Sequence, residues 1–198
     1  MSQTRRTLLL GAAATLATPS LLRAQALSEY TMEDFGGTTE PANARRNISG
    51  FQTIDWRDHF STLGVATIVA DTSSRALHFW SGDGSIYRLY PTSVPMSEEL
   101  TRRGYAEIVR KAEAPSWTPT ANMRARNPEL PVRIEGGDPM NPLGTHAMYL
   151  NWPAYLIHGT HDTRKIGRRS SSGCIGLYNE KIAELYAMTP IGAQVRLI

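Results

Sequence analysis

The chain has 198 residues, of which 20% are charged and 41% apolar, and its 16 glycines and 12 prolines form no biased tract. This composition excludes collagen, coiled coil and wholesale disorder, and the length suffices for one sizeable core. Three of the 21 basic residues and none of the 18 acidic residues lie within the first 26 positions, so the remaining chain has no net charge. The formal charge of +3 therefore gives no argument for binding nucleic acid or an anionic membrane.

The first 26 residues carry the pattern of an export signal. Arg5 and Arg6 directly precede an apolar run that is too short to span a bilayer, and Ala24-Gln25-Ala26 offers a small-x-small cleavage site. The arginine pair favours the twin-arginine export route. The alternative, an amphipathic N-terminal helix, would show acidic residues and a 3.6-residue periodicity that this segment lacks. We therefore expect a mature protein that begins near Leu27 and resides in the periplasm or cell envelope.

The chain after the signal is expected to form one domain. Residues 27–60 are polar and mixed, which indicates an arm or linker, and the domain should fill residues 61–198. Strands are predicted at 65–70, 76–80 and 86–90, because turn residues separate these apolar runs at intervals of about 8–12 residues. This spacing predicts an antiparallel meander. No later segment has the ~18 consecutive apolar residues that a membrane span needs.

The middle of the chain is less regular. Residues 97–114 fit two interpretations, because Ser97 and the acidic residues after it could open a helix that Gly104 would then interrupt. Residues 115–145 are rich in proline and glycine. A loop of this length is uncommon in a compact domain and is often functional. We therefore expect this segment to form one wall of a binding groove.

The C-terminal part is predicted to return to strands around one helix. Apolar strands are expected at 147–150 and 154–157, and residues 194–198 alternate as a final strand. Asn179 is predicted to cap a helix that Thr189-Pro190 ends. The predicted fold is mainly β with a few helices, and it has neither an internal repeat nor a second domain.

The single cysteine, Cys174, lies among small residues and cannot form an internal disulfide. Gly173 and Gly176 would let a substrate backbone approach closely and would leave main-chain N–H groups for a developing oxyanion. Upstream, His158 ends an apolar strand and could supply the base or cation that a thiol nucleophile needs. The alternatives are a buried inert thiol and a structural histidine, and composition does not decide between them.

The sequence offers no complete metal site. His158 and His161 form a His-x-x-His pair, but the segment supplies no third ligand for zinc. We therefore expect neither a metal nor an organic cofactor.

Three motifs follow one another in a fixed order: Ile157-His158-Gly159-Thr160, then Ile166-Gly167, then Ser171-Ser172-Gly173-Cys174-Ile175. Their order, and the 16 residues from His158 to Cys174, resemble the L,D-transpeptidase catalytic domain of the YkuD type. Flanking motifs extend the resemblance over residues 65–198. The resemblance implies a mainly β, β-sandwich-like domain with a few helices and the long Pro/Gly-rich loop.

The resemblance also implies a mechanism and a substrate. Cys174 would be the acylated nucleophile, His158 its base, and the Gly159 carbonyl would hold the imidazole, while the Gly173 and Cys174 amides would line the oxyanion hole. The donor and acceptor would be stem peptides of peptidoglycan, joined through the side-chain amine of diaminopimelate in a cell-wall cross-link. Carbapenems are expected to acylate the same cysteine.

Several further residues are predicted to touch the substrate. Ser171 and Ser172 precede the nucleophile, and Ser172 stands where the family often carries a second histidine. Trp117 and Tyr149 could line the groove, although each could equally pack in the core. Arg168 and Arg169 lie close to Cys174 and could bind the anionic wall peptide.

Gly176 is the larger departure from the family pattern, because the family usually carries Arg or Asn two residues after the cysteine. Without that side chain, the cation that binds a substrate carboxylate must come from elsewhere, or the donor must differ. The candidate cations are Arg124, Arg126, Lys165, Arg168 and Arg169. We favour a donor cut closer to its start, which would give 1→3 links in place of the ordinary 3→3 links.

Two other functions remain open from the sequence. A hydrolase would form the same thioester and resolve it with water, acting as a stem-peptide carboxypeptidase or endopeptidase. A non-catalytic wall-binding module would leave Cys174 and His158 idle. A papain-like protease does not fit, because its cysteine precedes its histidine in the chain.

Overall fold

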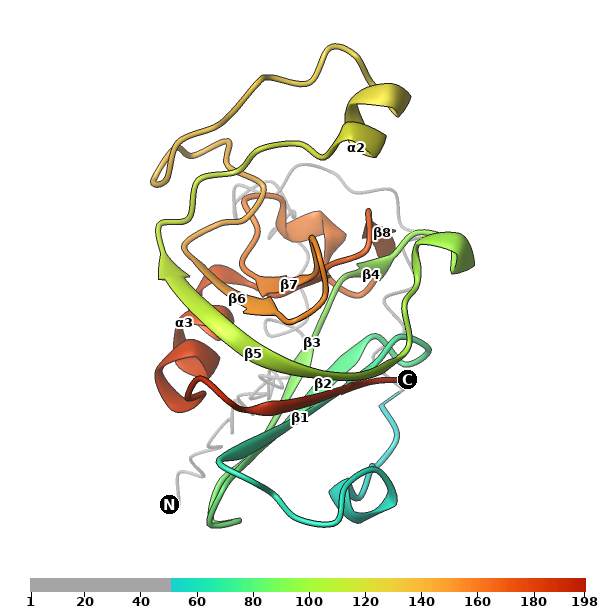
Figure 1. Cartoon of the computed structure of the whole chain (residues 1–198), viewed down its shortest axis with the longest axis vertical. Helices are drawn as coiled ribbons and strands as arrows, with labels where there is room; N and C mark the ends of the chain where they lie inside the picture. Colours follow the sequence, from blue (N-terminus) through green and yellow to red (C-terminus); the bar gives the residue numbers. More distant parts are fainter. Residues whose placement is uncertain (1–50) are drawn as a thin grey trace, which may run out of the picture. The chain divides into compact units, whose positions relative to one another are not determined.

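The computed structural model describes residues 51–198. The export signal and most of the predicted arm lie outside these residues. Within the described part, no helix is long and apolar enough to cross a membrane. The expected mainly β class is confirmed: within residues 51–198, one large mixed sheet curls into a half-barrel and two α-helices accompany it (Figure 1).

The large sheet contains eight strands in the order β3-β2-β1-β10-β5-β6-β7-β9, and a separate two-stranded sheet pairs β4 with β8. The strands are β1 (Ala66–Asp71), β2 (Ala76–Ser81), β3 (Tyr87–Pro91), β4 (Val94–Pro95), β5 (Gly104–Glu113), β6 (His146–Leu150), β7 (Leu156–His158), β8 (Arg169–Ser171), β9 (Ile175–Gly176) and β10 (Gln194–Leu197). The predicted meander is confirmed, because β1, β2 and β3 pair antiparallel in sequence. The C-terminal strand β10 runs parallel to β1 and antiparallel to β5, so it joins the meander to the rest of the sheet.

One hydrophobic core fills the curl of the sheet. Burying each large apolar side chain stabilises the fold by about 1.5–3 kcal/mol, which makes this core the main source of stability. Helix α3 (Asn179–Met188) contributes to it through the buried side chains of Ile182 and Leu185. The sheet contributes the fully buried side chains of Ile68, Leu77, Phe79, Ile108, Met148, Ile157, Ile175 and Leu197.

Residues 97–114 do not form the helix that was one interpretation of their sequence. A short 3-10 helix, η4 (Glu98–Leu100), is followed by the ten-residue strand β5. Gly104 is the first residue of that strand, with φ of +139°. Pairing of β5 with both β10 and β6 provides hydrogen bonds along most of its length, and these outweigh the local signal for a helix.

Asn179 does not cap α3, so that prediction is wrong. Tyr178 occupies the N-cap position and makes no side-chain capping bond. The Asn179 side chain instead accepts a hydrogen bond from the Thr145 N–H at 3.2 Å. The helix ends at Thr189 as predicted, and Lys111 on β5 donates to the carbonyl oxygens of Tyr186 and Thr189 at its C-terminal end.

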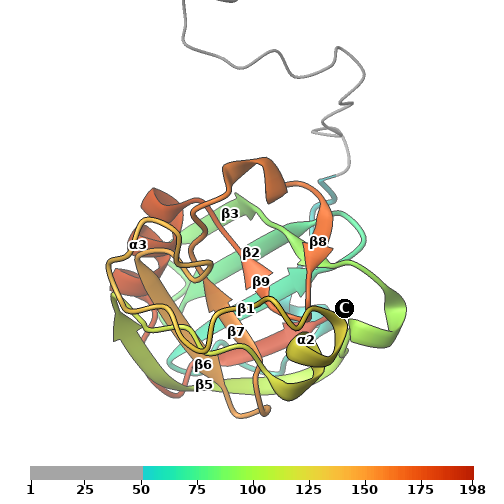
Figure 2. The ribbon, with the colours of Figure 1, turned by 90° about the horizontal axis from the view of Figure 1, so that it is seen from above.

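Residues 115–145 form the expected long loop, here called the cavity loop. It contains helix α2 (Ala121–Arg126), whose N-cap Thr120 accepts from the Met123 N–H. Trp117 and Ile134 form a two-residue antiparallel bridge, and the buried Asn141 amide donates to the carbonyl oxygens of Pro115 and Glu135. Figure 1 shows the loop at one end of the domain, and in Figure 2, seen from above, it passes over β6 and β7.

Candidate active site

A cavity of about 430 Å³ separates the cavity loop from the strand wall that carries His158 and Cys174. The lining from the cavity loop comes from Trp117, Met123, Arg126, Asn127, Leu130, Pro131, Ile134, Met140, Pro142 and Leu143. The remaining lining comes from Ser93, His158, Thr160, His161, Lys165, Ser170, Ser171, Ser172 and Cys174. Within residues 51–198 no cluster of three potential metal ligands exists.

His158 is the last residue of β7 and has one side-chain hydrogen bond that fixes its tautomer. Its Nδ1 lies 2.5 Å from the carbonyl oxygen of Gly159. Because a carbonyl can only accept, Nδ1 must carry the proton. The other ring nitrogen, Nε2, is then the basic atom that can receive a proton from a nucleophile.

Cys174 directly precedes β9, which pairs parallel with β7 so that Gly176 lies opposite His158. Side chains alternate along a strand, so positions 174 and 176 face the same side. A Cβ at Gly176 would lie only 3.9 Å from Cε1 of His158, which identifies that side as the one the imidazole occupies. The parallel pairing therefore brings the thiol and the imidazole to the same cavity, and the thiol lies 3.5 Å from the Ala154 carbonyl oxygen.

Burial favours the neutral forms of both the Cys174 thiol and the His158 imidazole. It raises the pKa of Cys174 to about 11, although a backbone hydrogen bond from Leu156 opposes part of the shift. It lowers the pKa of His158 to about 4, against the opposing effect of the Gly159 hydrogen bond and with a smaller contribution from the positive charge of Lys165. At neutral pH the resting pair is a thiol and an uncharged imidazole.

The turn before Cys174 is held by Ser171. Its hydroxyl donates to the Cys174 carbonyl oxygen at 2.6 Å and accepts from the Gly173 N–H at 3.3 Å. Gly173 has φ of +135°, a conformation that favours glycine. Of the two amides predicted for an oxyanion hole, that of Gly173 is therefore bonded to Ser171. The Cys174 N–H makes no hydrogen bond to a described residue, so it can be offered to a substrate oxygen.

The structure separates the five candidate cations into two groups. Arg126 and Lys165 line the cavity, and Arg126 donates to the Ser172 hydroxyl at 3.3 Å. Arg124, Arg168 and Arg169 do not line it. Arg124 donates to the Val132 carbonyl, and Arg169 forms an ion pair with Glu98 at 2.6 Å.

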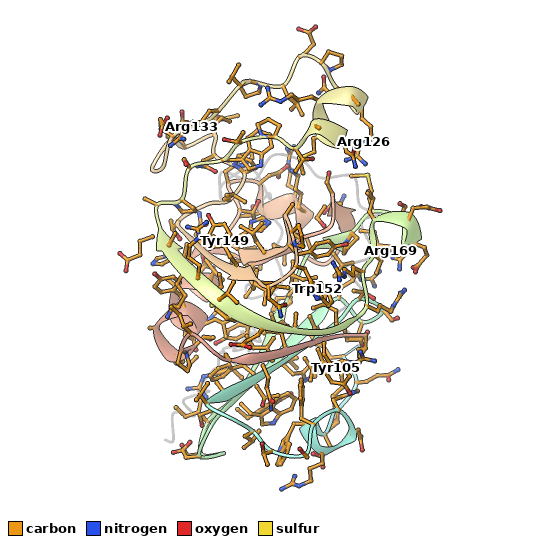
Figure 3. All side chains as sticks on the ribbon, in the orientation of Figure 1. Tyr105, Arg126, Arg133, Tyr149, Trp152 and Arg169 are labelled. Carbon is orange, nitrogen blue, oxygen red and sulfur yellow. The ribbon has the colours of Figure 1, made fainter. Side chains whose placement is uncertain are left out.

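The two aromatic residues predicted to line the groove also differ in their positions. Trp117 lines the cavity, whereas Tyr149 does not. The Tyr149 ring instead contacts Arg110, whose guanidinium lies 3.4 Å from the ring centroid. Figure 3 shows the label of Tyr149, which belongs to β6, below the cavity loop.

Gly176 packs closely against Ser93. The two residues exchange backbone hydrogen bonds of 2.8 and 3.1 Å, and a Cβ at Gly176 would lie within 2.4 Å of the Ser93 hydroxyl oxygen. A side chain therefore needs Ser93 to move. Sequence reasoning missed Ser93, because nothing local distinguishes it from other serines.

Asn179 is a second residue whose position the sequence did not reveal. Its Oδ1 would lie about 2.3 Å from a Cβ at Gly159 and about 2.1 Å from one at Gly144. With the bond from the Thr145 N–H, this side chain ties the end of the cavity loop to the backbone that orients His158. The glycines at 144 and 159 make room for it.

A cysteine and a tautomer-fixed histidine facing one cavity form a site suited to nucleophilic acyl chemistry. The sequence model of the L,D-transpeptidase catalytic domain, YkuD, matches residues 66–197. The chain therefore belongs to the YkuD family of L,D-transpeptidase catalytic domains.

Named relatives agree with this family. The chain is 64% identical over 159 residues to a predicted L,D-transpeptidase encoded in the ATP synthase subunits region (ORF 5) of Fuscovulum blasticum, covering 80% of this chain and 82% of that protein. It is 36% identical over 136 residues to the predicted L,D-transpeptidase ErfK/SrfK of Escherichia coli, covering 66% of this chain. That match spans only 43% of the Escherichia coli protein.

Solved structures show the same fold. An L,D-transpeptidase from Mycobacterium smegmatis superposes with a TM-score of 0.52 at 21% identity, covering 68% of this chain and 59% of that one. The LdtMt1 transpeptidase in complex with imipenem gives the same TM-score at 15% identity and likewise covers 68% of this chain and 59% of that one.

Proposed function

We propose that this protein is a peptidoglycan L,D-transpeptidase that forms a thioester between Cys174 and a stem peptide and passes the acyl group to the side-chain amine of diaminopimelate. The observation that carries the proposal is the hydrogen bond from His158 Nδ1 to the Gly159 carbonyl, which leaves Nε2 as a base in the cavity that Cys174 lines. Membership of the L,D-transpeptidase family supports a stem peptide as the substrate.

In the first half of the reaction, the Cys174 proton moves to Nε2 of His158 as the sulfur attacks the donor carbonyl carbon. The Cys174 N–H is placed to stabilise the resulting oxyanion. Collapse of this intermediate breaks the C–N bond, and the imidazolium returns the proton to the leaving amine. The products are a thioester on Cys174 and a released amine.

In the second half, the acceptor amine attacks the thioester and loses a proton to His158. The C–S bond breaks, and the imidazolium reprotonates the departing sulfur. An uncharged carbonyl is a sufficient partner for Nδ1, because the imidazolium is needed only while a negative charge lies on sulfur or oxygen. Neutral resting forms, favoured by burial, suit this concerted proton transfer.

The muropeptide products distinguish the possible types of cross-link. The absence of a side chain at Gly176 does not by itself require an altered donor, because Arg126 and Lys165 place two cations in the cavity. The mature protein would be incubated with purified cell wall, and the muropeptides analysed by mass spectrometry. New dimers with 3→3 or 1→3 links support the transpeptidase, and shortened monomers without dimers would instead identify the hydrolase.

We also propose that the protein acts in the periplasm or cell envelope after removal of residues 1–26. The Arg5-Arg6 pair and Ala24-Gln25-Ala26 support this location. N-terminal sequencing of protein from the cell envelope should begin near Leu27, and a chain that retains Met1 there would contradict it. A carbapenem is expected to add its mass to Cys174, as the imipenem complex of LdtMt1 suggests.

A further inference from the structure

The described lining of the cavity beside Cys174 carries charge of one sign. Among the lining side chains that belong to residues 51–198, Arg126 and Lys165 are cationic and none is Asp or Glu. Two acidic residues of the flanking segments are engaged in ion pairs outside it: Asp162 with Arg164, and Glu135 with Arg133. An anion that enters the cavity therefore meets two positive charges, and no carboxylate from the described part of the chain lines the cavity to compete with it.

Arg126 approaches the nucleophile from the cavity loop. It is the last residue of α2, and its Nη2 donates to the Ser172 hydroxyl at 3.3 Å, two residues before Cys174. This contact is long and has a neutral acceptor. A guanidinium has five N–H donors in a planar fork, so a carboxylate could bind it in bidentate fashion.

Lys165 approaches from the opposite wall. It ends the 3-10 helix η5 (Thr163–Lys165), in the segment between His158 and Cys174. Its charge is close enough to act on the imidazole of His158, where it adds to burial in lowering the pKa. The two cations thus come from different segments of the chain and line the same cavity as the reacting pair.

We propose that Arg126 and Lys165 form a carboxylate-binding site that holds an anionic group of the acyl donor next to Cys174. The identity of the ligand, a carboxylate of the stem peptide, rests on the proposed function, but the charge of the site does not. A fixed carboxylate would orient the donor so that its carbonyl carbon lies at the sulfur, which raises the rate through positioning.

Arg124 provides a matched control on the same helix. It lies two residues before Arg126, carries the same charge, donates to the Val132 carbonyl at 3.1 Å and does not line the cavity. Arg124→Gln and Arg126→Gln therefore remove the same charge from the loop, and only the second removes it from the cavity.

The first test uses alkylation of Cys174, which does not depend on transpeptidase activity. Iodoacetate is an anion and iodoacetamide is its neutral analogue, so the ratio of their rates reports the charge near the sulfur. We expect Arg126→Gln and Lys165→Gln each to lower this ratio about threefold to tenfold, and added salt to lower it in the parent protein. Arg124→Gln should leave it unchanged. An unchanged ratio in both cavity variants would overturn the proposal.

The second test uses a stem tetrapeptide and the same peptide with its carboxylates converted to amides. The parent protein should lose about tenfold in kcat/KM on the amidated donor, because the charge-assisted hydrogen bond that positions the donor is removed. Arg126→Gln should be slow on both donors and should discriminate little between them.

The two tests separate the failure of this site from the failure of the proposed function. If neither donor reacts with the parent protein but the alkylation ratio responds as expected, the transpeptidase function is wrong and the anion site stands. If both donors react equally well in the parent protein, the transpeptidase function stands and the carboxylate site is wrong.

Discussion

The two walls of the cavity are built in different ways. On the strand wall, backbone hydrogen bonds place the reacting groups: β7 pairs with β9, and the Gly159 carbonyl orients His158. On the loop wall, a few side-chain bonds, such as those of Asn141, hold a long segment that carries the cation Arg126. The comparison teaches that main-chain pairing positions the candidate nucleophile and base, whereas side-chain hydrogen bonds position the loop that carries Arg126.

The largest expected effect is on the strand wall. Cys174→Ala and His158→Ala should each reduce acyl transfer by at least about a thousandfold, and the double variant should be little worse than either, because the pair acts as one unit. Both proteins should remain folded, since neither change empties a large core volume. Product formation from a stem peptide measures the loss. Near-normal transfer by either variant would show that the wall does not carry the nucleophile and its base.

The contact between Gly176 and Ser93 gives the next effect. Gly176→Ala should lower acyl transfer about tenfold to a hundredfold, because the added Cβ meets the Ser93 hydroxyl close to the imidazole of His158. The double variant Ser93→Ala/Gly176→Ala removes that oxygen and should recover most of the rate. Steady-state kinetics on all three variants test this. Failure of the double variant to recover would mean that Gly176 is needed for a reason other than space.

Asn179 connects the two walls, and its removal should have a smaller effect. Asn179→Ala frees the Thr145 N–H and leaves a gap beside Gly159, so kcat should fall about threefold to tenfold with little change in KM. Asn179→Asp keeps the acceptor and should recover part of the rate. Glu180→Ala, an exposed neighbour on the same helix, is the control and should behave as the parent protein.

The pH dependence of stability tests the burial of His158 on the strand wall. Its folded-state pKa of about 4 lies below the value of 6.5 in the unfolded chain, so only the unfolded state gains a proton between these two values. The parent protein should therefore lose roughly 1–3 kcal/mol of unfolding free energy, relative to His158→Gln, as the pH falls from 6.5 to 4. Urea titrations at both pH values measure the difference. Parallel losses in the two proteins would show that the imidazole is solvated.

The sequence predicted the strand wall more completely than the loop wall. Apolar runs separated by turn residues predict the meander. Local signals are also sufficient to predict the strand that ends at His158. Strand β5 was ambiguous, because Gly104 suggested an interrupted helix and the partners β6 and β10 lie far away in the chain. The strands that β5 pairs with are therefore determined by the whole chain and not by its local sequence.

The site residues divide along the same line. The thiol, the base and the Gly159 carbonyl belong to short contiguous motifs, so residue types and spacing suffice to nominate them. The cations that line the cavity could not be identified in this way. Arg169 pairs with Glu98, which lies 71 residues away in the chain, and Arg126 reaches the cavity from a helix that no local pattern predicted. An asparagine at the start of a helix favours a capping role, so the sequence predicts Asn179 as a cap. Only the tertiary structure shows that its side chain accepts from the Thr145 N–H instead.

Formation of an acyl-enzyme on Cys174 is the central claim, and intact-mass analysis tests it most directly. Mature protein mixed with a stem tetrapeptide, without an acceptor amine, should gain the mass of the peptide less its leaving residue, and peptide mapping should place that mass on Cys174. Cys174→Ala should show no adduct, and an added amine should remove the adduct from the parent protein. An adduct that persists on Cys174→Ala, or a parent protein that turns over substrate with Cys174 blocked, would contradict the account.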